Sequence, residues 1–129
     1  MTTLIICLFI AILFPYLIKL PLGYAMAHAK GGYNNNYPRE QQAALEGFGA
    51  RALAAHQNSF EALIVFSTAV LTAIATNHVT HNVEYLAVAF IVLRVIYTAL
   101  YLMNLASLRS SVWFLGLLAC LTIMWSCIP

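Results

Sequence analysis

The sequence predicts an all-α integral membrane protein built as a bundle of four transmembrane helices. Of its 129 residues, 63% are hydrophobic and only 8% are charged, whereas soluble domains average about 25% charged residues. At about 20 residues per span, the length allows at most four or five transmembrane helices. We expect a single domain over residues 1–129. A nucleic-acid partner is not expected, because the formal charge of +2 is small and no basic stripe is present.

The first predicted span covers residues 3–22. Lys19 lies late in this apolar run and can extend its ammonium group to the headgroup level. A cleaved signal peptide is the rival interpretation, since residues 25–27 (AMA) resemble a cleavage site. We favour a retained span, because no Lys or Arg precedes the apolar run and Lys19 separates it from residues 25–27.

The only long polar stretch, residues 28–42, is predicted to be an exposed loop that leads into the second helix. Pro38 suits the first turn of a helix, and Glu40 complements the positive end of the helix dipole. The second helix is therefore predicted over residues 38–76. Because this length exceeds the bilayer, its first turns are expected to project from the membrane.

A short loop then leads to the third predicted span, residues 83–105. Residues 106–109 are predicted to form a tight turn, and the fourth span follows at residues 110–128. Trp113 and Trp125 near its ends suit the two membrane interfaces.

The distribution of Lys and Arg predicts the orientation. The loop between the first two spans carries Lys30 and Arg39, the loop after the third span carries Arg109, and the loop between them has neither residue type. By the positive-inside rule, segments 27–45 and 106–110 face the cytoplasm. Both termini then lie on the opposite side.

Polar residues within the second helix form one stripe. Arg51 and Asn58 are seven residues apart and lie within roughly 20° of each other around a helix. Glu61, three residues further, is a neighbour of Asn58 on that face. An ionisable group at membrane depth costs about 2.5–3.5 kcal/mol on insertion scales. The stripe is therefore predicted to face a bundle interior or a polar cavity.

A second stripe follows on the third helix, where Arg94, Tyr97 and Tyr101 recur at helical spacing. Arg109 and Ser110 lie at the next turn. Together the two stripes suit a small zwitterionic ligand that has several carboxylates. Arg binds carboxylates in a bidentate fork, and a Glu receives an ammonium group. Tyr hydroxyls need polar partners when they are buried.

The same residues also allow a purely structural interpretation, in which no ligand binds. In it, Glu61 and Arg94 form an ion pair between helices, and Asn58 links helices with about 1 kcal/mol. The tyrosines are then ordinary core aromatics. Near the cytoplasmic end of the second helix, His56 and Gln57 suit a solvated or headgroup-facing role at least as well as catalysis.

No metal site is expected. His78 and His81 lie in a short loop and are too few to form a convincing ligand set. The three cysteines are predicted to be packing residues within apolar stretches, with no spacing typical of metal ligands: Cys7, Cys120 and Cys127.

The chain resembles the MAPEG family, the membrane-associated proteins in eicosanoid and glutathione metabolism. The resemblance rests on residues 51–61 (RALAAHQNSFE), on residues 94–101 (RVIYTALY), and on Arg109 with Ser110. Its order and spacing cover essentially the whole chain, and the small bacterial members are the most similar. The family implies a homotrimer of four-helix subunits, here in a bacterial inner membrane. It also implies that glutathione binds between neighbouring subunits near the cytoplasmic side.

The resemblance assigns roles to individual residues. Arg109 matches the arginine that faces the glutathione sulfur, and Ser110 lies beside it, so these two are the catalytic candidates. Asn58 and Glu61 match positions that hold the glutathione backbone. The remaining candidates for binding or for shaping the site are Arg51, Gln57, Arg94, Tyr97 and Tyr101.

One position departs from the family pattern. Ala54 stands where the eicosanoid synthases have a second arginine that binds a glutathione carboxylate, and the next candidate, Gln57, is neutral. Losing one charge-assisted hydrogen bond weakens binding by about 1.5–3 kcal/mol, or roughly 10- to 150-fold. Three outcomes are then open: Arg51, Lys30 or Arg39 of a neighbouring subunit substitutes and glutathione binds, glutathione fails to bind, or another thiol replaces it.

The sequence thus predicts a glutathione-dependent transferase, with peroxidase activity as a second reaction, acting on a small hydrophobic electrophile. The expected partners are further copies of the chain in a homotrimer, membrane lipids and glutathione as co-substrate. The alternative is a non-catalytic membrane protein whose polar residues only hold helices and subunits together. A small exporter is disfavoured, because no duplicated half is visible.

Overall fold

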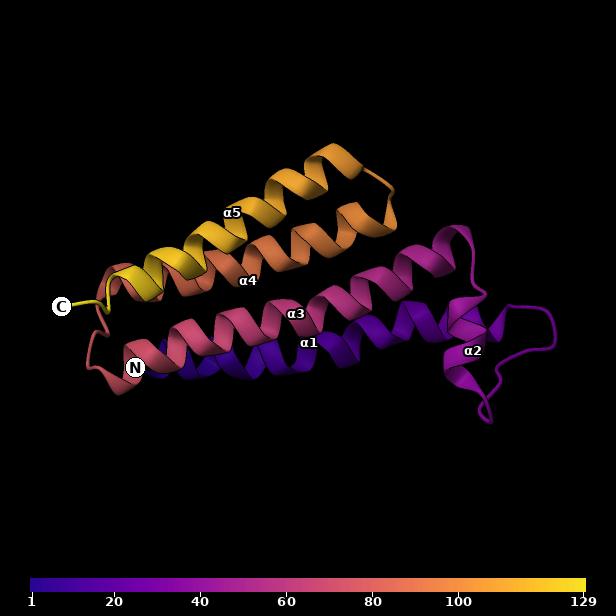
Figure 1. Cartoon of the computed structure of the whole chain (residues 1–129), viewed down its shortest axis with the longest axis horizontal. Coiled ribbons are helices and arrows are strands. Elements are labelled where there is room, and N and C mark those ends of the chain that lie inside the picture. The colour runs from indigo at the N-terminus through magenta and orange to yellow at the C-terminus, as the bar shows by residue number, and fades with distance from the viewer.

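The computed structural model describes all 129 residues and contains only helices. Four long helices are α1 (Thr2–Ala27), α3 (Gly47–Ala75), α4 (His81–Leu102) and α5 (Ala106–Trp125), and a short helix, α2 (Pro38–Ala43), precedes α3 (Figure 1). Each long helix has the length and apolar composition needed to cross a membrane. The prediction of four spans is confirmed.

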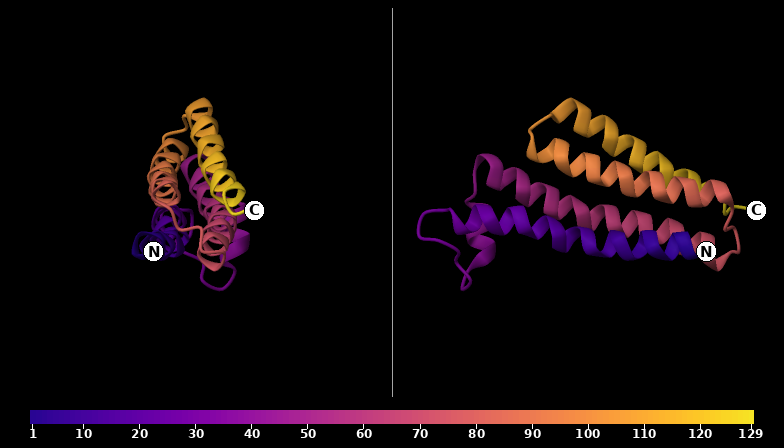
Figure 2. Two further views of the ribbon diagram at one scale, coloured as in Figure 1. Left: turned by 90° about the vertical axis from the view of Figure 1, so that its left-hand side faces the viewer. Right: turned by 180° about the vertical axis from the view of Figure 1, so that it is seen from behind.

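The helices pack as two antiparallel pairs. In Figures 1 and 2, α1 lies along α3 and α4 lies along α5. The pairs converge at the end that carries both termini and the α3–α4 connection. They diverge toward the end that carries α2 and the α4–α5 turn. The bundle is therefore wedge-shaped, and residues near the α4–α5 turn lie at its open end.

The main apolar core lies where the two pairs converge. Twelve of its thirteen buried residues come from the four long helices, and the thirteenth, Cys127, follows the end of α5. The rings of Phe66 and Phe90 stack across α3 and α4 with centroids 4.3 Å apart and planes 4° apart. Cys7, Cys120 and Cys127 are all free, buried members of this core. The prediction that the cysteines are packing residues is confirmed.

Small residues bring α1 and α3 close together. The buried face of α3 near its start consists of small side chains, namely Gly49, Ala52, Ala55 and Ser59. A Cβ atom added to Gly49 would lie 3.3 Å from the Cβ of Ala25 in α1. Because lipid gives little hydrophobic drive for helix association, close packing of this kind supplies much of the interaction.

The predicted helix over residues 38–76 is wrong in one respect, because residues 44–46 interrupt it. Gly47 has a φ of +54°, which a residue with a side chain rarely adopts. The chain thereby turns, and α2 lies against the end of α1 instead of continuing α3. Gln41 fixes it there by donating to the carbonyl oxygens of Gly32 at 2.7 Å and Met26 at 3.2 Å.

The turn predicted at residues 106–109 lies three residues earlier, at residues 103–105. Asn104 has a φ of +62°, and asparagine is among the residues that enter this left-handed region most readily. Helix α5 therefore starts at Ala106, and Arg109 belongs to its first turn. The first span also extends further than predicted, to Ala27 rather than to Leu22.

Candidate functional site

The site begins with an amide on α3 that joins two charged side chains. Asn58 Nδ2 donates to Glu61 Oε2 at 2.9 Å, as expected for residues three apart on a helix. Arg94 Nη2 on α4 donates to Asn58 Oδ1, also at 2.9 Å. Only 5% of Arg94 is exposed. No ion pair within 4 Å joins Glu61 to Arg94. The ion pair expected in the structural interpretation is therefore absent, and the Asn58 amide bridges the two charged groups instead.

Aromatic rings continue this line along α4. The guanidinium carbon of Arg94 lies 4.1 Å from the centroid of the Tyr97 ring. The rings of Tyr97 and Tyr101 meet edge to face, with centroids 5.6 Å apart. The guanidinium carbon of Arg109 then lies 4.1 Å from the centroid of the Tyr101 ring. Cation–π contacts of this length fix the direction of both guanidinium groups.

The α4–α5 turn determines where Arg109 lies. Its backbone N–H donates to the carbonyl of Leu105 at 3.0 Å, which forms the first turn of α5. Ser110 follows on the same turn. The N-terminal end of a helix carries a partial positive charge. The Arg109 guanidinium adds a full charge to it, so this end of the groove favours an anion.

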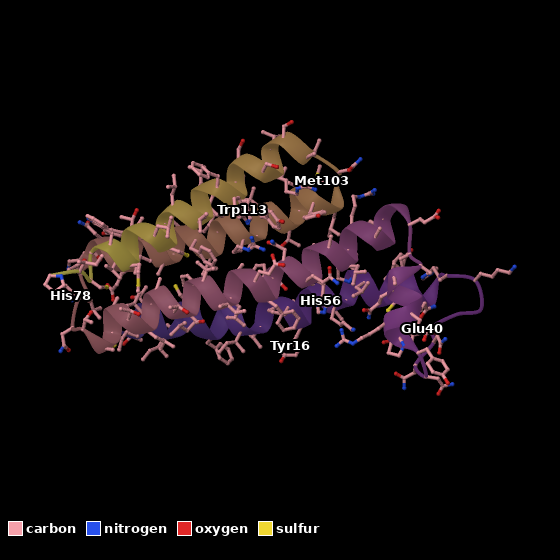
Figure 3. All side chains as sticks on the ribbon, in the orientation of Figure 1. Tyr16, Glu40, His56, His78, Met103 and Trp113 are labelled. Carbon is pink, nitrogen blue, oxygen red and sulfur yellow. The ribbon has the colours of Figure 1, made fainter.

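Two adjoining hollows contain most of the predicted site residues. The first has a volume of about 100 Å³ and is lined by Asn58, Glu61 and Arg94 together with apolar side chains of α3, α4 and α5. The second is an open groove of about 470 Å³, lined by Tyr97, Tyr101, Arg109, Ser110, Trp113 and Phe114. Trp113 lines both hollows and lies on the α5 side of the bundle (Figure 3).

Two predicted residues lie outside both hollows. Arg51 Nε donates to the carbonyl of Leu102 at 3.3 Å, which ties α3 to the C-terminal end of α4. Gln57 lines a third cavity, between α1, α2 and α3. Within one chain, the structure therefore brings Asn58 and Glu61 of α3 together with the predicted residues of α4 and α5. Arg51 and Gln57 lie elsewhere.

Sequence reasoning did not identify the apolar wall of the first hollow. Trp113 was predicted to be an interfacial residue near the start of a span, but it lies about two turns inside α5, because that helix begins at Ala106. Gly116 and Cys120 also line the wall. Gly116 and Cys120 are four residues apart, so they lie on the same face of α5. Small residues at this spacing are typical of a helix face that approaches another helix closely, and this signal could have indicated the wall.

A four-span bundle with charged residues at membrane depth defines a multi-pass integral membrane protein with a polar site between its helices. The sequence matches the MAPEG family over residues 3–129. The chain therefore belongs to the MAPEG family, as the resemblance implied. Searches among curated proteins and among solved structures give no significant match.

Proposed function

We propose that the protein is a membrane-bound glutathione-dependent transferase that acts on hydrophobic electrophiles. The family to which it belongs includes glutathione transferases. The observation that carries the proposal is the unbroken line of polar and aromatic contacts that runs from Glu61 through Asn58 and Arg94 to Tyr101 and Arg109.

The chemistry of this line fits glutathione. Glutathione has one ammonium group, two carboxylates, two peptide groups and a thiol. The exposed carboxylate of Glu61 suits the ammonium group, and the Asn58 amide suits a peptide group or a carboxylate. At the other end, Arg109 and Ser110 suit an anionic sulfur, through a charge and a hydroxyl donor.

Arg109 would prepare the nucleophile. A free thiol has a pKa of about 8.5 and is mostly protonated at neutral pH. Lowering the pKa of the glutathione thiol to about 6.5 requires about 2.7 kcal/mol of differential stabilisation. One guanidinium in a pocket of low dielectric constant is sufficient for this. The sulfur then forms a bond to carbon as the leaving group departs with its electron pair.

A hydroperoxide substrate would give a second reaction at the same thiolate. The sulfur attacks the terminal peroxide oxygen, the O–O bond breaks, and the alkoxide leaves as an alcohol after taking a proton. A second glutathione thiol displaces hydroxide, which leaves as water, and glutathione disulfide forms. Glutathione is oxidised and the hydroperoxide is reduced.

The second hollow gives a hydrophobic substrate a route from the bilayer. Trp113 and Phe114 line the groove beside Arg109, and their side chains are 45% and 54% exposed. Both belong to the long apolar helix α5. A hydrophobic electrophile dissolved in the bilayer can therefore approach the sulfur position along this wall, while glutathione approaches from the polar end.

A non-catalytic role remains the alternative, and two observations favour it. Arg94 and Asn58 satisfy each other, and every buried side-chain nitrogen or oxygen atom has a hydrogen-bond partner within the chain. Buried polar residues that are already paired can serve helix packing alone. Ala54, in place of an expected arginine, supports the same interpretation.

Calorimetric titration of glutathione into the detergent-purified protein tests the proposal, together with turnover of a chromogenic aryl halide. Saturable binding, weakened in Glu61→Gln, and turnover, lost in Arg109→Gln, are expected. Glu40→Gln is the matched control, because Glu40 is an exposed carboxylate on α2 and lines neither hollow. Absence of heat and of thermal stabilisation at millimolar glutathione would refute the proposal and favour the structural role.

A further inference from the structure

The C-terminal end of α4 is bonded to a helix of the other pair through Arg51. Near the start of α3, Arg51 donates from Nε to the carbonyl oxygen of Leu102, the last residue of α4, at 3.3 Å. The two helix pairs diverge toward this end of the bundle (Figures 1 and 2). The hydrogen bond therefore crosses the open side of the wedge.

The backbone of the α4–α5 turn explains why this carbonyl needs a donor from elsewhere. The N–H of Leu105 donates to the carbonyl of Leu100 at 3.0 Å, and the N–H of Asn104 donates to that of Tyr101 at 3.1 Å. With Asn104 at a φ of +62°, these two bonds form a Schellman motif. The motif leaves the carbonyl of Leu102 without a backbone donor.

Arg51 supplies the missing donor, and its charge suits the position. The C-terminal end of a helix carries a partial negative charge, so a cation there is favourable. The side chain of Leu102 adds an apolar contact, because it packs against the small core of Leu22, Met26 and Ala52 from α1 and α3. One residue of α4 thus contacts the α1–α3 pair through both its backbone and its side chain.

The turn transmits this attachment to Arg109. Leu105 ends the Schellman motif and is also the residue that precedes α5, and its carbonyl accepts from the N–H of Arg109 at 3.0 Å. The ring of Tyr101, one residue before Leu102, lies against the Arg109 guanidinium. A displacement of the end of α4 would therefore move Arg109 with it, relative to Glu61 on α3.

A second bond between α3 and α4 lies deeper in the bundle. Arg94 donates to Asn58, eight residues before Leu102 on α4 and seven residues after Arg51 on α3. Eight helical residues span about 12 Å. The inner bond can hold the middle of the two helices while their ends separate, so the position of the last two turns of α4 depends on the contacts of Leu102.

We propose that Arg51 is a positioning residue, which holds Arg109 within reach of Asn58 and Glu61 by fixing the end of α4. This inference rests on the proposed function, in which Arg109 stabilises the glutathione thiolate. At an effective dielectric constant of about 20, moving a guanidinium from about 4 Å to about 6 Å from the sulfur changes the ionisation constant of the thiol about tenfold. The competing role for Arg51 is that of a charge that binds a glutathione carboxylate.

Two substitutions of matched length separate the hydrogen bond from the charge. In Arg51→Gln the side-chain nitrogen follows the same number of bonds as Nε, so it can donate to Leu102 although the charge is lost. Arg51→Met has a side chain of that length with neither the donor nor the charge. Positioning predicts that only Arg51→Met is impaired, whereas a charge that binds glutathione predicts that both variants are impaired.

Hydrogen exchange of the ligand-free protein in detergent, measured by mass spectrometry, tests the attachment without glutathione. We expect the amides of residues 103–105 to exchange about tenfold faster in Arg51→Met, because a charge-assisted hydrogen bond is lost. Arg51→Gln should stay close to the wild type, and so should the control Glu40→Gln, at an exposed position of α2. Unchanged exchange in Arg51→Met would overturn the inference, whether or not glutathione binds.

The ultraviolet absorbance of the bound thiolate, titrated with pH at saturating glutathione, tests the effect on Arg109. We expect the midpoint to rise by about one pH unit in Arg51→Met, so that the ionised share at pH 7 falls about threefold. Arg51→Gln should keep the wild-type midpoint. Equal shifts in both variants, or a shift in neither, would overturn the inference.

Two further outcomes are decided by the same variants. Absence of glutathione binding by the wild type would refute the proposed function, and exchange in Arg51→Met would then decide alone whether Arg51 holds the turn. If Arg51→Met fails to fold, Arg51→Lys replaces it. Positioning predicts that the Lys and Gln variants both keep the midpoint, since both can donate to Leu102. Retention in Arg51→Lys alone would overturn the inference and assign Arg51 to ligand binding.

Discussion

Arg94 on α4 donates a hydrogen bond to the side-chain oxygen of Asn58 on α3, at 2.9 Å. The amide nitrogen of Asn58 in turn donates to Glu61. A neutral amide thus lies between a buried guanidinium and an exposed carboxylate. This arrangement joins the two helix pairs of the bundle and leaves the Glu61 carboxylate accessible for a ligand.

The first prediction concerns the stability of this junction. Asn58→Leu leaves the buried Arg94 without its amide acceptor, which costs about 1–3 kcal/mol. We expect a lower thermal unfolding midpoint in detergent, measured by circular dichroism. Asn82→Leu, at an exposed position of α4, is the control and should change the midpoint little. An unchanged midpoint in Asn58→Leu would show that the hydrogen bond does not hold the helix pairs together.

The second prediction separates ligand binding from packing at Glu61. Glu61 is exposed and forms no ion pair within 4 Å, so Glu61→Gln should leave the unfolding midpoint almost unchanged. Loss of a charge-assisted bond to the glutathione ammonium group should weaken binding roughly 10- to 150-fold. Calorimetry of the wild type and variant measures this difference. A large loss of stability with unchanged affinity would instead assign Glu61 to packing.

The third prediction concerns the apolar wall of the first hollow. A Cβ added to Gly116 would lie 3.7 Å from the ring of Phe90, which is an ordinary contact. Gly116→Ala should therefore be tolerated. Gly116→Leu should fill the hollow of about 100 Å³ and reduce turnover of bulky electrophiles more than that of small ones. Equal turnover in both variants, measured with aryl halides of increasing size, would show that the hollow is not used.

The sequence was sufficient to predict the four spans and most of the polar line. Long apolar runs define the spans, and helical periodicity places Asn58 beside Glu61 and Arg94 near Tyr97. Both relations are local, so they follow from the spacing of residues within one helix. The structure adds the hydrogen bond from Arg94 on α4 to Asn58 on α3. Spacing within a single helix cannot predict a contact between two helices.

The remaining features depend on tertiary structure or on single backbone angles. The break before α3 requires a positive φ at Gly47, and the early turn requires one at Asn104. Neither changes the hydrophobic pattern, so periodicity did not reveal them. The cavity between α1, α2 and α3 that Gln57 lines also escaped prediction, because it forms only when α2 turns back and brings Arg39 toward Lys19 and His56.

The last prediction tests the role of Arg109 through its dependence on pH. If the guanidinium lowers the pKa of the glutathione thiol from about 8.5 to about 6.5, about three quarters of the bound thiol is ionised at pH 7. In Arg109→Gln only about 3% would be ionised, so turnover at pH 7 should fall about 25-fold. Above pH 9 the thiol is largely ionised in both proteins, and the two rates should converge.

Turnover of an aryl halide between pH 6 and pH 9.5 measures both profiles. The control variant Glu40→Gln, at an exposed position of α2 outside both hollows, should reproduce the wild-type profile. A loss that is the same at every pH would show that Arg109 acts on the electrophile or on packing instead. Size-exclusion chromatography and circular dichroism separate those two cases. Equal losses of folded protein and of activity would assign Arg109 a structural role, since its contact with the Tyr101 ring joins α5 to α4.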